Sequence, residues 1–341
     1  MKIAILTYHR AFSYGALLQC YALSTFLHQQ GHEVKLLRSD LHGENTWKYW
    51  LNSYTKCSSF RNFRKHFLPS EANSGEQFDL YIVGSDQVWN PSFPLRPLDY
   101  YFSFLSPVAK RISYAASFGM NDWDLGGEMT KKIQECLCRF STVTVREQSS
   151  ANICRDVFGI HADIVLDPTL LLGDFENLYS VPINEENGTL FCYRVSQQED
   201  WGSLSKDIAN KLGLKLYTPL PVKRIKCAPN MGGLNTVHLS VQEWLDAIRS
   251  SSFVLTDSFH TMVFAILNRK PFLVLPSVKS RMGRVTSLLS ILNIEEHYKE
   301  VGDIIDVDKL LGVVEKYDEV FSLLSQQRLK SIHVFKDCLL I

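Results

Sequence analysis

The feature that most constrains this chain is a repeated succession of apolar strand, polar turn and helix. Its clearest instance is an apolar strand, Phe253 to Leu255, which leads into the polar hinge Thr256-Asp257-Ser258. A helix whose apolar residues recur at three- and four-residue spacing follows at once, at Phe259, Met262, Val263 and Ile266. Such alternation is typical of parallel sheets, because parallel strands need a crossover connection that a helix supplies. The expected fold class is therefore α/β.

The chain has 341 residues, which suits two domains of ordinary size. The alternating pattern weakens into polar residues around 173–187, where Pro182 falls, and this predicts a domain boundary. We expect an N-terminal doubly wound α/β domain at 1–180 and a C-terminal one at 181–341 that ends in helices, the two facing a cleft. An aromatic and basic insertion at about 40–75 is expected to be helical, with its aromatics packed inward.

Composition excludes several classes of protein. Lys plus Arg equals Asp plus Glu, 36 each, which argues against non-specific nucleic-acid binding. The short apolar run Met1 to Thr7 predicts a strand rather than a signal peptide, and no run reaches the roughly 18 apolar residues of a spanning helix. We therefore expect a cytoplasmic protein, with the stretch Trp47 to Phe67 as a candidate for peripheral contact at the inner face of the membrane. No CxxC pair occurs among the eight cysteines, so no metal site is expected.

The hinge places His260 in the first turn of a helix, directly after a strand. Ligands of open α/β sheets bind at the carboxyl ends of strands. A helix start also suits an anion, through its backbone N–H groups and its positive dipole end. The unperturbed pKa of histidine lies near neutrality, which favours a role in proton transfer. The alternative is a histidine that only satisfies a hydrogen bond within the core.

Other polar clusters also follow strands, and their common placement predicts that they line one cleft. They are Tyr8-His9-Arg10 with Tyr14-Gly15, Gly84-Ser85-Asp86-Gln87, Ser117-Phe118-Gly119, Arg146-Glu147, and Asp167. Arg146 could hold a carboxylate or phosphate in bidentate fashion, or pair with Glu147 or Asp167. Asp86 could orient a sugar hydroxyl or act as a base, or cap a helix. Gly15 belongs to no GxGxxG motif or P-loop, so no nucleotide cofactor is expected.

Six motifs in order carry a resemblance to a known family. They are Tyr14-Gly-Ala-Leu-Leu-Gln-Cys-Tyr-Ala-Leu23, Tyr81-Ile-Val-Gly-Ser-Asp-Gln-Val-Trp-Asn-Pro91, Tyr114-Ala-Ala-Ser-Phe-Gly119, Thr144-Val-Arg-Glu147, Val165-Leu-Asp-Pro-Thr-Leu170 and Thr256-Asp-Ser-Phe-His260. Across roughly residues 1–295 the chain resembles the polysaccharide pyruvyl transferase family. The resemblance implies a GT-B-like fold of two Rossmann-like domains.

The resemblance also implies a reaction. The pyruvyl group of phosphoenolpyruvate would pass to two hydroxyls of one glycan sugar, giving a cyclic ketal and releasing phosphate. Phosphoenolpyruvate is then a donor substrate, and no cofactor is expected. The acceptors would be capsular polysaccharides, exopolysaccharides or cell-envelope glycans, often while still lipid-linked. Two alternatives remain open, a nucleotide-sugar-dependent glycosyltransferase and a non-catalytic member of a glycan assembly complex.

Site roles follow from the same resemblance. His260 would be the general acid/base or a phosphate ligand, and Arg146 the arginine that grips the donor. Asp86 is the second catalytic candidate, because of its position after an apolar strand. The remaining substrate-binding candidates are Ser258, Phe259, Gly15, Tyr14, Ser85 and Arg284. Ser258 stands where some relatives carry an arginine, and Thr261 where many carry a glycine. Arg10, Arg281 or Arg284 would then supply the missing phosphate cation.

Overall fold

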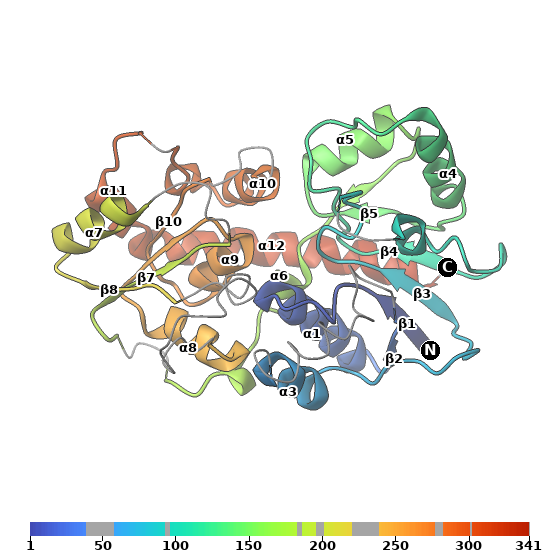
Figure 1. Ribbon diagram of the computed structural model, residues 1–341, viewed down its shortest axis with the longest axis horizontal. Helices are drawn as coiled ribbons and strands as arrows, with labels where there is room; N and C mark the ends of the chain where they lie inside the picture. Colours follow the sequence, from blue (N-terminus) through green and yellow to red (C-terminus); the bar gives the residue numbers. More distant parts are fainter. Residues whose placement is uncertain are drawn as a thin grey trace, which may run out of the picture. The chain divides into compact units, whose positions relative to one another are not determined.

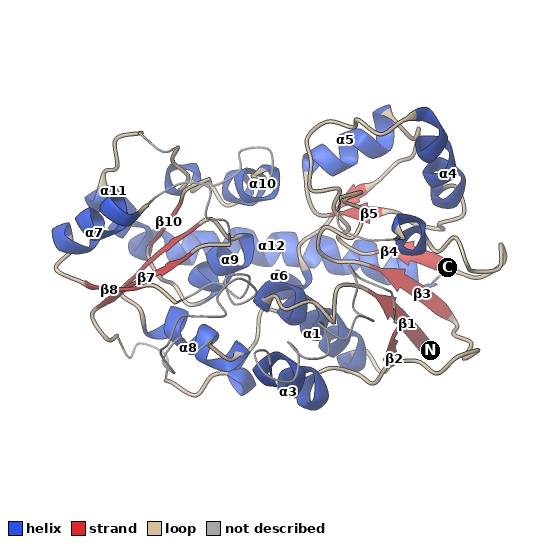
Figure 2. Cartoon of the chain, viewed as in Figure 1, coloured by secondary structure: helices blue, strands red, loops and turns tan. Residues whose placement is uncertain are grey.

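The computed structural model describes residues 1–38, 58–92, 96–182, 186–195, 201–219, 239–276, 282–300 and 302–340. The chain divides into two compact units. The first comprises Met1–Leu51, Asn62–Leu172 and Ser325–Ile341, and the second comprises Asn52–Arg61 and Gly173–Leu324. Each unit contains a parallel sheet with helices packed on it, so the prediction of an α/β chain with two Rossmann-like sheets is confirmed (Figure 2).

The first unit is built on the sheet order β2-β1-β3-β4, with every pair parallel. Its strands are β1 (Lys2–Leu6), β2 (Glu33–Leu36), β3 (Leu80–Val83) and β4 (Arg111–Ser113). A further parallel pair, β5 (Thr144–Val145) and β6 (Asp163–Ile164), continues beside β4 through single bridges. The helices are α1 (Tyr14–Gln29), η1 (Pro97–Tyr101), α4 (Gly127–Leu137), α5 (Gln148–Asp156) and α6 (Pro168–Leu172) (Figure 1). The boundary between the units falls within α3 (Ser58–Phe67), whose residues from Asn62 on belong to the first unit.

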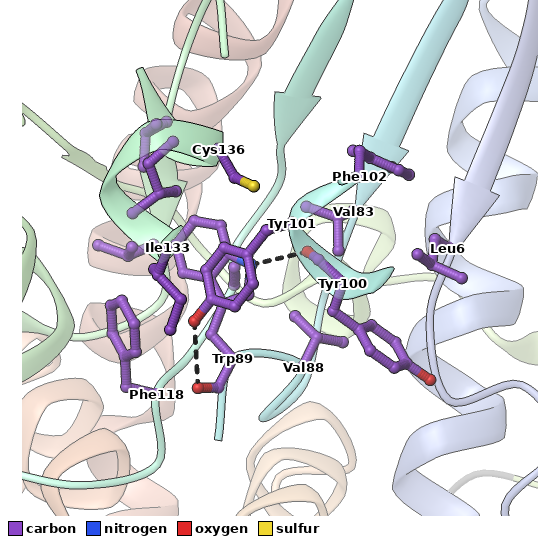
Figure 3. Close-up of a cluster of buried hydrophobic side chains, with 14 of the residues drawn as sticks. Leu6, Val83, Val88, Trp89, Tyr100, Tyr101, Phe102, Phe118, Ile133 and Cys136 are labelled. Atoms are coloured by element: carbon purple, nitrogen blue, oxygen red, sulfur yellow. Dashed lines mark hydrogen bonds between the residues drawn. The ribbon is translucent and has the colours of Figure 1, made fainter. Parts of the chain in front are cut away.

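Both faces of this sheet are covered, which explains why its central strands β1 and β3 are apolar at nearly every position. Ile3 and Ile5 point to a core that includes residues of α1 and α6. Ala4 and Leu6 point to the opposite core, since successive side chains of a strand alternate between faces. Figure 3 shows the second core, where the buried ring of Trp89 packs against Tyr101 and Phe118 at centroid distances of 5.4 and 5.2 Å.

The second unit repeats this plan with the parallel order β10-β9-β7-β8. Its strands are β7 (Thr189–Tyr193), β8 (Lys215–Tyr217), β9 (Phe253–Thr256) and β10 (Phe272–Val274). Its helical segments are η2 (Glu176–Leu178), α7 (Gly202–Lys211), α8 (Val241–Ser250), α9 (Phe259–Leu267), α10 (Gly283–Ile291), η5 (Glu295–His297) and α11 (Val307–Leu311). Residues of α7 and α11 pack with the strands in one buried core.

The C-terminal helix α12 (Val313–Leu340) departs from the predicted division. The prediction assigned residues 181–341 to one domain, whereas the last residues, Ser325–Ile341, belong to the first unit. The physical reason is packing: Phe335 is fully buried, with its ring 5.7 Å from Phe26 of α1 and 4.4 Å from Tyr114. Sequence periodicity marks α12 as amphipathic but does not say which core its apolar side joins.

Two local predictions concern helix ends and the insertion. Ser240 caps α8 through a capping box with Glu243, as the sequence predicts. In α3, Phe60 and Phe63 are buried while Lys65 and His66 are exposed, so inward packing of aromatics is confirmed for this part of the insertion. Residues 39–57 lie outside the described part of the chain. Within the described ranges, no helix combines the length and the apolar character needed to cross a membrane.

Candidate functional site

The hinge between β9 and α9 is held rigidly by its own side chains. Thr256 donates from Oγ1 to the carbonyl of Tyr193 on β7 at 2.7 Å, and it accepts from the backbone N–H of Ser258 at 3.0 Å. Asp257 accepts from the backbone N–H of Val195 through Oδ1 at 2.6 Å. Hydrogen bonds of the hinge residues therefore connect the end of β9 to the end of the neighbouring strand β7, and they fix where α9 begins.

Ser258 is the N-cap of α9, and its Oγ accepts from the backbone N–H of Thr261 at 3.3 Å. This is the position where some relatives carry an arginine, so the side chain here stabilises the helix start instead of adding a charge. His260 follows in the first turn and is 7% exposed. Its ring lies 5.2 Å from that of Phe259, nearly perpendicular to it. The hinge thus gives His260 one defined backbone position at the carboxyl end of the sheet.

Two arginines lie near this hinge in the second unit. The Arg284 guanidinium, in the first turn of α10, lies 5.6 Å from the centroid of the Phe259 ring. This proximity supports Arg284, among the proposed replacements for the missing arginine, and Arg281 lies outside the described residues. Arg194 directly follows Tyr193, the residue of β7 that pairs with Thr256, and stacks over Trp201 at 4.6 Å. Sequence reasoning missed Arg194, although its position after an apolar strand was a usable signal.

In the first unit, Arg146 is the centre of a buried ion network at the carboxyl ends of three strands. Its Nη1 lies 2.7 Å from Asp167, and its other nitrogens lie 3.6 Å from Asp86 and 3.6 Å from Glu147. Burial would lower the pKa of Arg146, but the surrounding carboxylates outweigh burial and raise it above its ordinary value. Arg146 is therefore permanently positively charged, and it already forms ion pairs with three carboxylates. The ion pairs that the sequence offered as the alternative role of Arg146 are present.

Asp86 lies at the edge of this network. Its backbone has φ of 70°, a left-handed conformation that aspartate tolerates better than most residues. Its Oδ1 accepts from the backbone N–H of Gln87 at 2.9 Å, and the side chain is 18% exposed. A turn rather than a helix follows, so Asp86 is not a helix cap. A partly exposed carboxylate held beside a buried guanidinium can accept a proton or a hydrogen bond from a hydroxyl.

Three other candidates of the first unit are buried. The single hydroxyl proton of Ser85 lies within reach of two acceptors, the carbonyl of Ala115 at 2.9 Å and Asp167 at 3.2 Å from Oγ, and its backbone N–H donates to Gln19 at 3.1 Å. Tyr14 and Gly15 lie buried in the first turn of α1. These contacts assign Ser85 to the support of the strand ends.

The sequence also predicted core packing for Trp89 and Phe118, and both are buried.

The predicted site residues thus fall into two groups. Arg146, Asp86, Ser85, Tyr14 and Gly15 belong to the first unit. His260, Ser258, Phe259 and Arg284 belong to the second unit. The structure brings Arg146, Asp86 and Ser85 together, through Asp167, and it brings Ser258, Phe259, His260 and Arg284 together at the β9–α9 hinge. Tyr14 and Gly15 lie buried at the start of α1. The convergence of Arg146 and His260 on one small anion stays a prediction.

Comparison with known proteins identifies the family. The model of the polysaccharide pyruvyl transferase family matches residues 14–277, and the chain belongs to this family. General stress protein 30 of Bacillus subtilis strain 168 is 27% identical over 172 residues, which cover 48% of this chain and 47% of that protein. The matched region therefore spans about half the length of this curated relative.

Solved structures agree on the fold. S. aureus MnaA in complex with UDP has a TM-score of 0.53 at 13% identity, covering 96% of this chain and 90% of that one. A putative UDP-N-acetylglucosamine 2-epimerase of Listeria monocytogenes scores 0.50 at 13% identity, with coverage of 96% and 90%. The glycotransferase of kitacinnamycin scores 0.50 at 11% identity, with coverage of 97% and 95%. At such identities the likeness concerns the fold alone, and it confirms the GT-B-like architecture.

Proposed function

We propose that this protein transfers the pyruvyl group of phosphoenolpyruvate to two hydroxyls of one sugar in a capsular, exopolysaccharide or cell-envelope glycan. The product is a cyclic pyruvate ketal, and phosphate is released. Family membership supports the transferase class. The observation that carries the residue assignment is the hydrogen-bonded β9–α9 hinge, which places His260 at a helix start, next to Phe259, whose ring centroid lies 5.6 Å from the Arg284 guanidinium. The transfer involves no net oxidation or reduction, so it needs no redox cofactor.

The donor has a carboxylate and a phosphate, and the hinge suits such an anion. The backbone N–H groups of Phe259 and His260 lie at the start of α9, which is the positive end of the helix dipole. Arg284 adds a permanent positive charge nearby, because its guanidinium lies 5.6 Å from the centroid of the Phe259 ring. In this proposal Arg284 takes the role of the arginine that Ser258 replaces.

The chemistry requires proton transfers that balance. A proton added to the methylene carbon of phosphoenolpyruvate gives cation character to the carbon that bears the phosphate. One sugar hydroxyl attacks that carbon, the bond to the phosphate oxygen breaks, and the second hydroxyl closes the ring. Of the two hydroxyl protons, one replaces the proton given to the methylene group and one leaves with phosphate. We assign the first transfer to His260, a role typically worth about 10²- to 10⁴-fold in rate.

Asp86 and Arg146 have a different part in the proposal. Asp86 is the partly exposed carboxylate of the first unit, and we assign it to a sugar hydroxyl. Arg146 is surrounded by Asp86, Glu147 and Asp167, so a donor phosphate would have to compete with three carboxylates for its charge. We therefore assign Arg146 to positioning Asp86 rather than to direct contact with the donor. This revises the role that the family resemblance suggested for Arg146.

The test is release of inorganic phosphate from phosphoenolpyruvate in the presence of a bacterial cell-envelope glycan, with mass spectrometry of the glycan. We expect phosphate release and the mass gain of a pyruvate ketal. His260→Ala should lower the rate by at least about 10²-fold with an unchanged thermal transition. His161→Ala is the matched control, because His161 is a highly exposed histidine of the other unit. If the protein releases nucleotide from a nucleotide-sugar but releases no phosphate from phosphoenolpyruvate, the glycosyltransferase alternative is favoured instead.

A further inference from the structure

The turn at residues 166–170 of the first unit supports the Arg146 network, and we call it the Asp167 turn. Thr169 donates to Oδ1 of Asp167 from its Oγ1 at 2.6 Å and from its backbone N–H at 3.0 Å. The other carboxylate oxygen, Oδ2, lies 2.7 Å from Nη1 of Arg146. The backbone carbonyl of Asp167 accepts from the N–H of Leu170 at 2.9 Å. The backbone of the turn therefore fixes the carboxylate that pairs with Arg146.

Two side chains of α12 bond to this turn from a distant part of the sequence. Ser331 is 3% exposed, and its Oγ accepts from the backbone N–H of Leu166 at 3.0 Å. Arg328, three residues earlier on the same helix, donates from Nε to the carbonyl of Leu170 at 2.9 Å. Residues three apart lie on one face of a helix, so both side chains reach the turn together. They hold the chain immediately before Asp167 and three residues after it.

The two bonds supply partners for backbone groups at the ends of regular structure. Leu166 lies past the end of strand β6, and Leu170 belongs to the five-residue helix α6, whose last carbonyls have no partner within the helix. The hydroxyl proton of Ser331 is donated to the carbonyl of Gln327 at 2.9 Å, so its oxygen acts as the acceptor for Leu166. A buried backbone group left unpaired costs free energy, so we expect the turn to shift when Ser331 or Arg328 loses its side chain.

We propose that Ser331 and Arg328 are positioning residues for the glycan acceptor, and that they act on Asp86 through the Asp167 turn and Arg146. The inference rests on the proposed function, in which Asp86 contacts a sugar hydroxyl. Arg146 lies 2.7 Å from Asp167 and 3.6 Å from Asp86, so a displaced Asp167 would draw the guanidinium away from Asp86. Neither Ser331 nor Arg328 touches the acceptor in this proposal. Both lie beyond residue 277, where the match to the family model ends.

The first test is steady-state kinetics of the full chain with phosphoenolpyruvate and a bacterial cell-envelope glycan. Ser331→Ala and Arg328→Met should each lower kcat/KM for the glycan by about tenfold, since a misplacement of 1 Å costs up to about 10²-fold. The KM for phosphoenolpyruvate should stay unchanged, because its proposed site is in the second unit.

Each variant has a matched control that should keep the wild-type kcat/KM for the glycan. Ser240→Ala also removes a serine Oγ that accepts from a backbone N–H, but it does so in the second unit. Lys330→Met removes an exposed cation of the same helix as Arg328.

A second measurement needs no substrate. The backbone N–H of Gln87 donates to Oδ1 of Asp86 at 2.9 Å, so amide hydrogen exchange at Gln87 reports on the position of that carboxylate. Ser331→Ala and Arg328→Met should accelerate exchange at Gln87 and in the Asp167 turn by roughly fivefold, about the effect of one lost hydrogen bond. Ser240→Ala should leave both at the wild-type rate.

The two measurements separate the possible outcomes. Unchanged exchange at Gln87 in both α12 variants, or an unchanged kcat/KM for the glycan in variants that form the ketal, would overturn the proposal. An equal loss in Ser331→Ala and Ser240→Ala would assign the effect to stability alone and overturn it as well. Because exchange involves no turnover, accelerated exchange at Gln87 in a chain that forms no ketal supports the link from α12 to Asp86 and refutes the proposed function alone.

Discussion

At the scale of single residues, several charged groups of this protein form buried or partly buried ion networks. Arg146 is 6% exposed and meets three carboxylates whose residues follow three different strands. An isolated buried charge is costly, so each member of such a network depends on the others. Because Arg146 lies 3.6 Å from Asp86, we expect a change at Arg146 to disturb Asp86 and, through it, the proposed acceptor site.

Glu71 provides a pH prediction at the same scale. Its folded-state pKa is about 2, below its ordinary value of 4.5, chiefly because of the hydrogen bond from His9. A depressed carboxylate pKa contributes stability that is fully present above the ordinary pKa and is lost as pH falls toward the folded value. We expect wild type to lose stability between about pH 4.5 and pH 2, and Glu71→Gln to show a weaker dependence there. Urea unfolding at pH 6 and pH 3 gives the free energy of unfolding at each pH. An equal loss of this free energy between the two pH values in wild type and Glu71→Gln would contradict the prediction.

At the scale of elements, two helices of the second unit begin with a serine cap, but only one of them carries a proposed catalytic residue. Ser240 caps α8 with a reciprocal bond from Glu243, whereas Ser258 caps α9 at the hinge that carries His260. In both caps a serine Oγ accepts a hydrogen bond from the backbone N–H three residues further on, so a comparison of their alanine variants separates stability from function.

We expect Ser240→Ala and Ser258→Ala each to lower the free energy of unfolding by about 1 kcal/mol, the usual effect of losing a serine cap. Only Ser258→Ala should also lower the turnover of phosphoenolpyruvate, because it loosens the helix start that positions His260. Urea unfolding and phosphate release measure the two effects. If both variants keep wild-type turnover, the hinge has no part in positioning the histidine.

At the scale of the whole molecule, the chain contributes to two cores and returns to the first at its end. The helix α12 begins in the second unit and ends in the first, where Phe335 and Cys338 join the core that contains Ile3 and Ile5. The stability of the first unit therefore depends on residues far from it in sequence.

Phe335→Ala tests this dependence. The ring is fully buried against Phe26 and Tyr114, so its loss should cost about 3–5 kcal/mol. Hydrogen exchange should accelerate in β1 and β3 more than in β7 and β9. Leu329→Ala on the same helix is the control, because Leu329 is 69% exposed and should have little effect. Uniform acceleration across both sheets would show that the two units unfold as one.

The sequence by itself determined the features that local periodicity encodes. Alternating apolar strands and helices indicated two parallel sheets, Ser240 and Glu243 announced a capping box, and the hinge before His260 marked a strand end. Each of these depends on residues within a few positions of one another, so spacing alone reveals them. The order of motifs along the chain likewise identified the family.

Only the tertiary structure decided which distant groups meet. It placed the carboxylates of Asp86 and Asp167 around Arg146, Glu71 beside His9, and Arg284 over Phe259. It also assigned Ser325–Ile341 to the first unit. Such contacts depend on strand order and on how each helix packs against its sheet, and residues separated by tens of positions carry no shared period that would reveal them. The local pattern therefore tells where a polar residue follows a strand, and the packing tells what it touches.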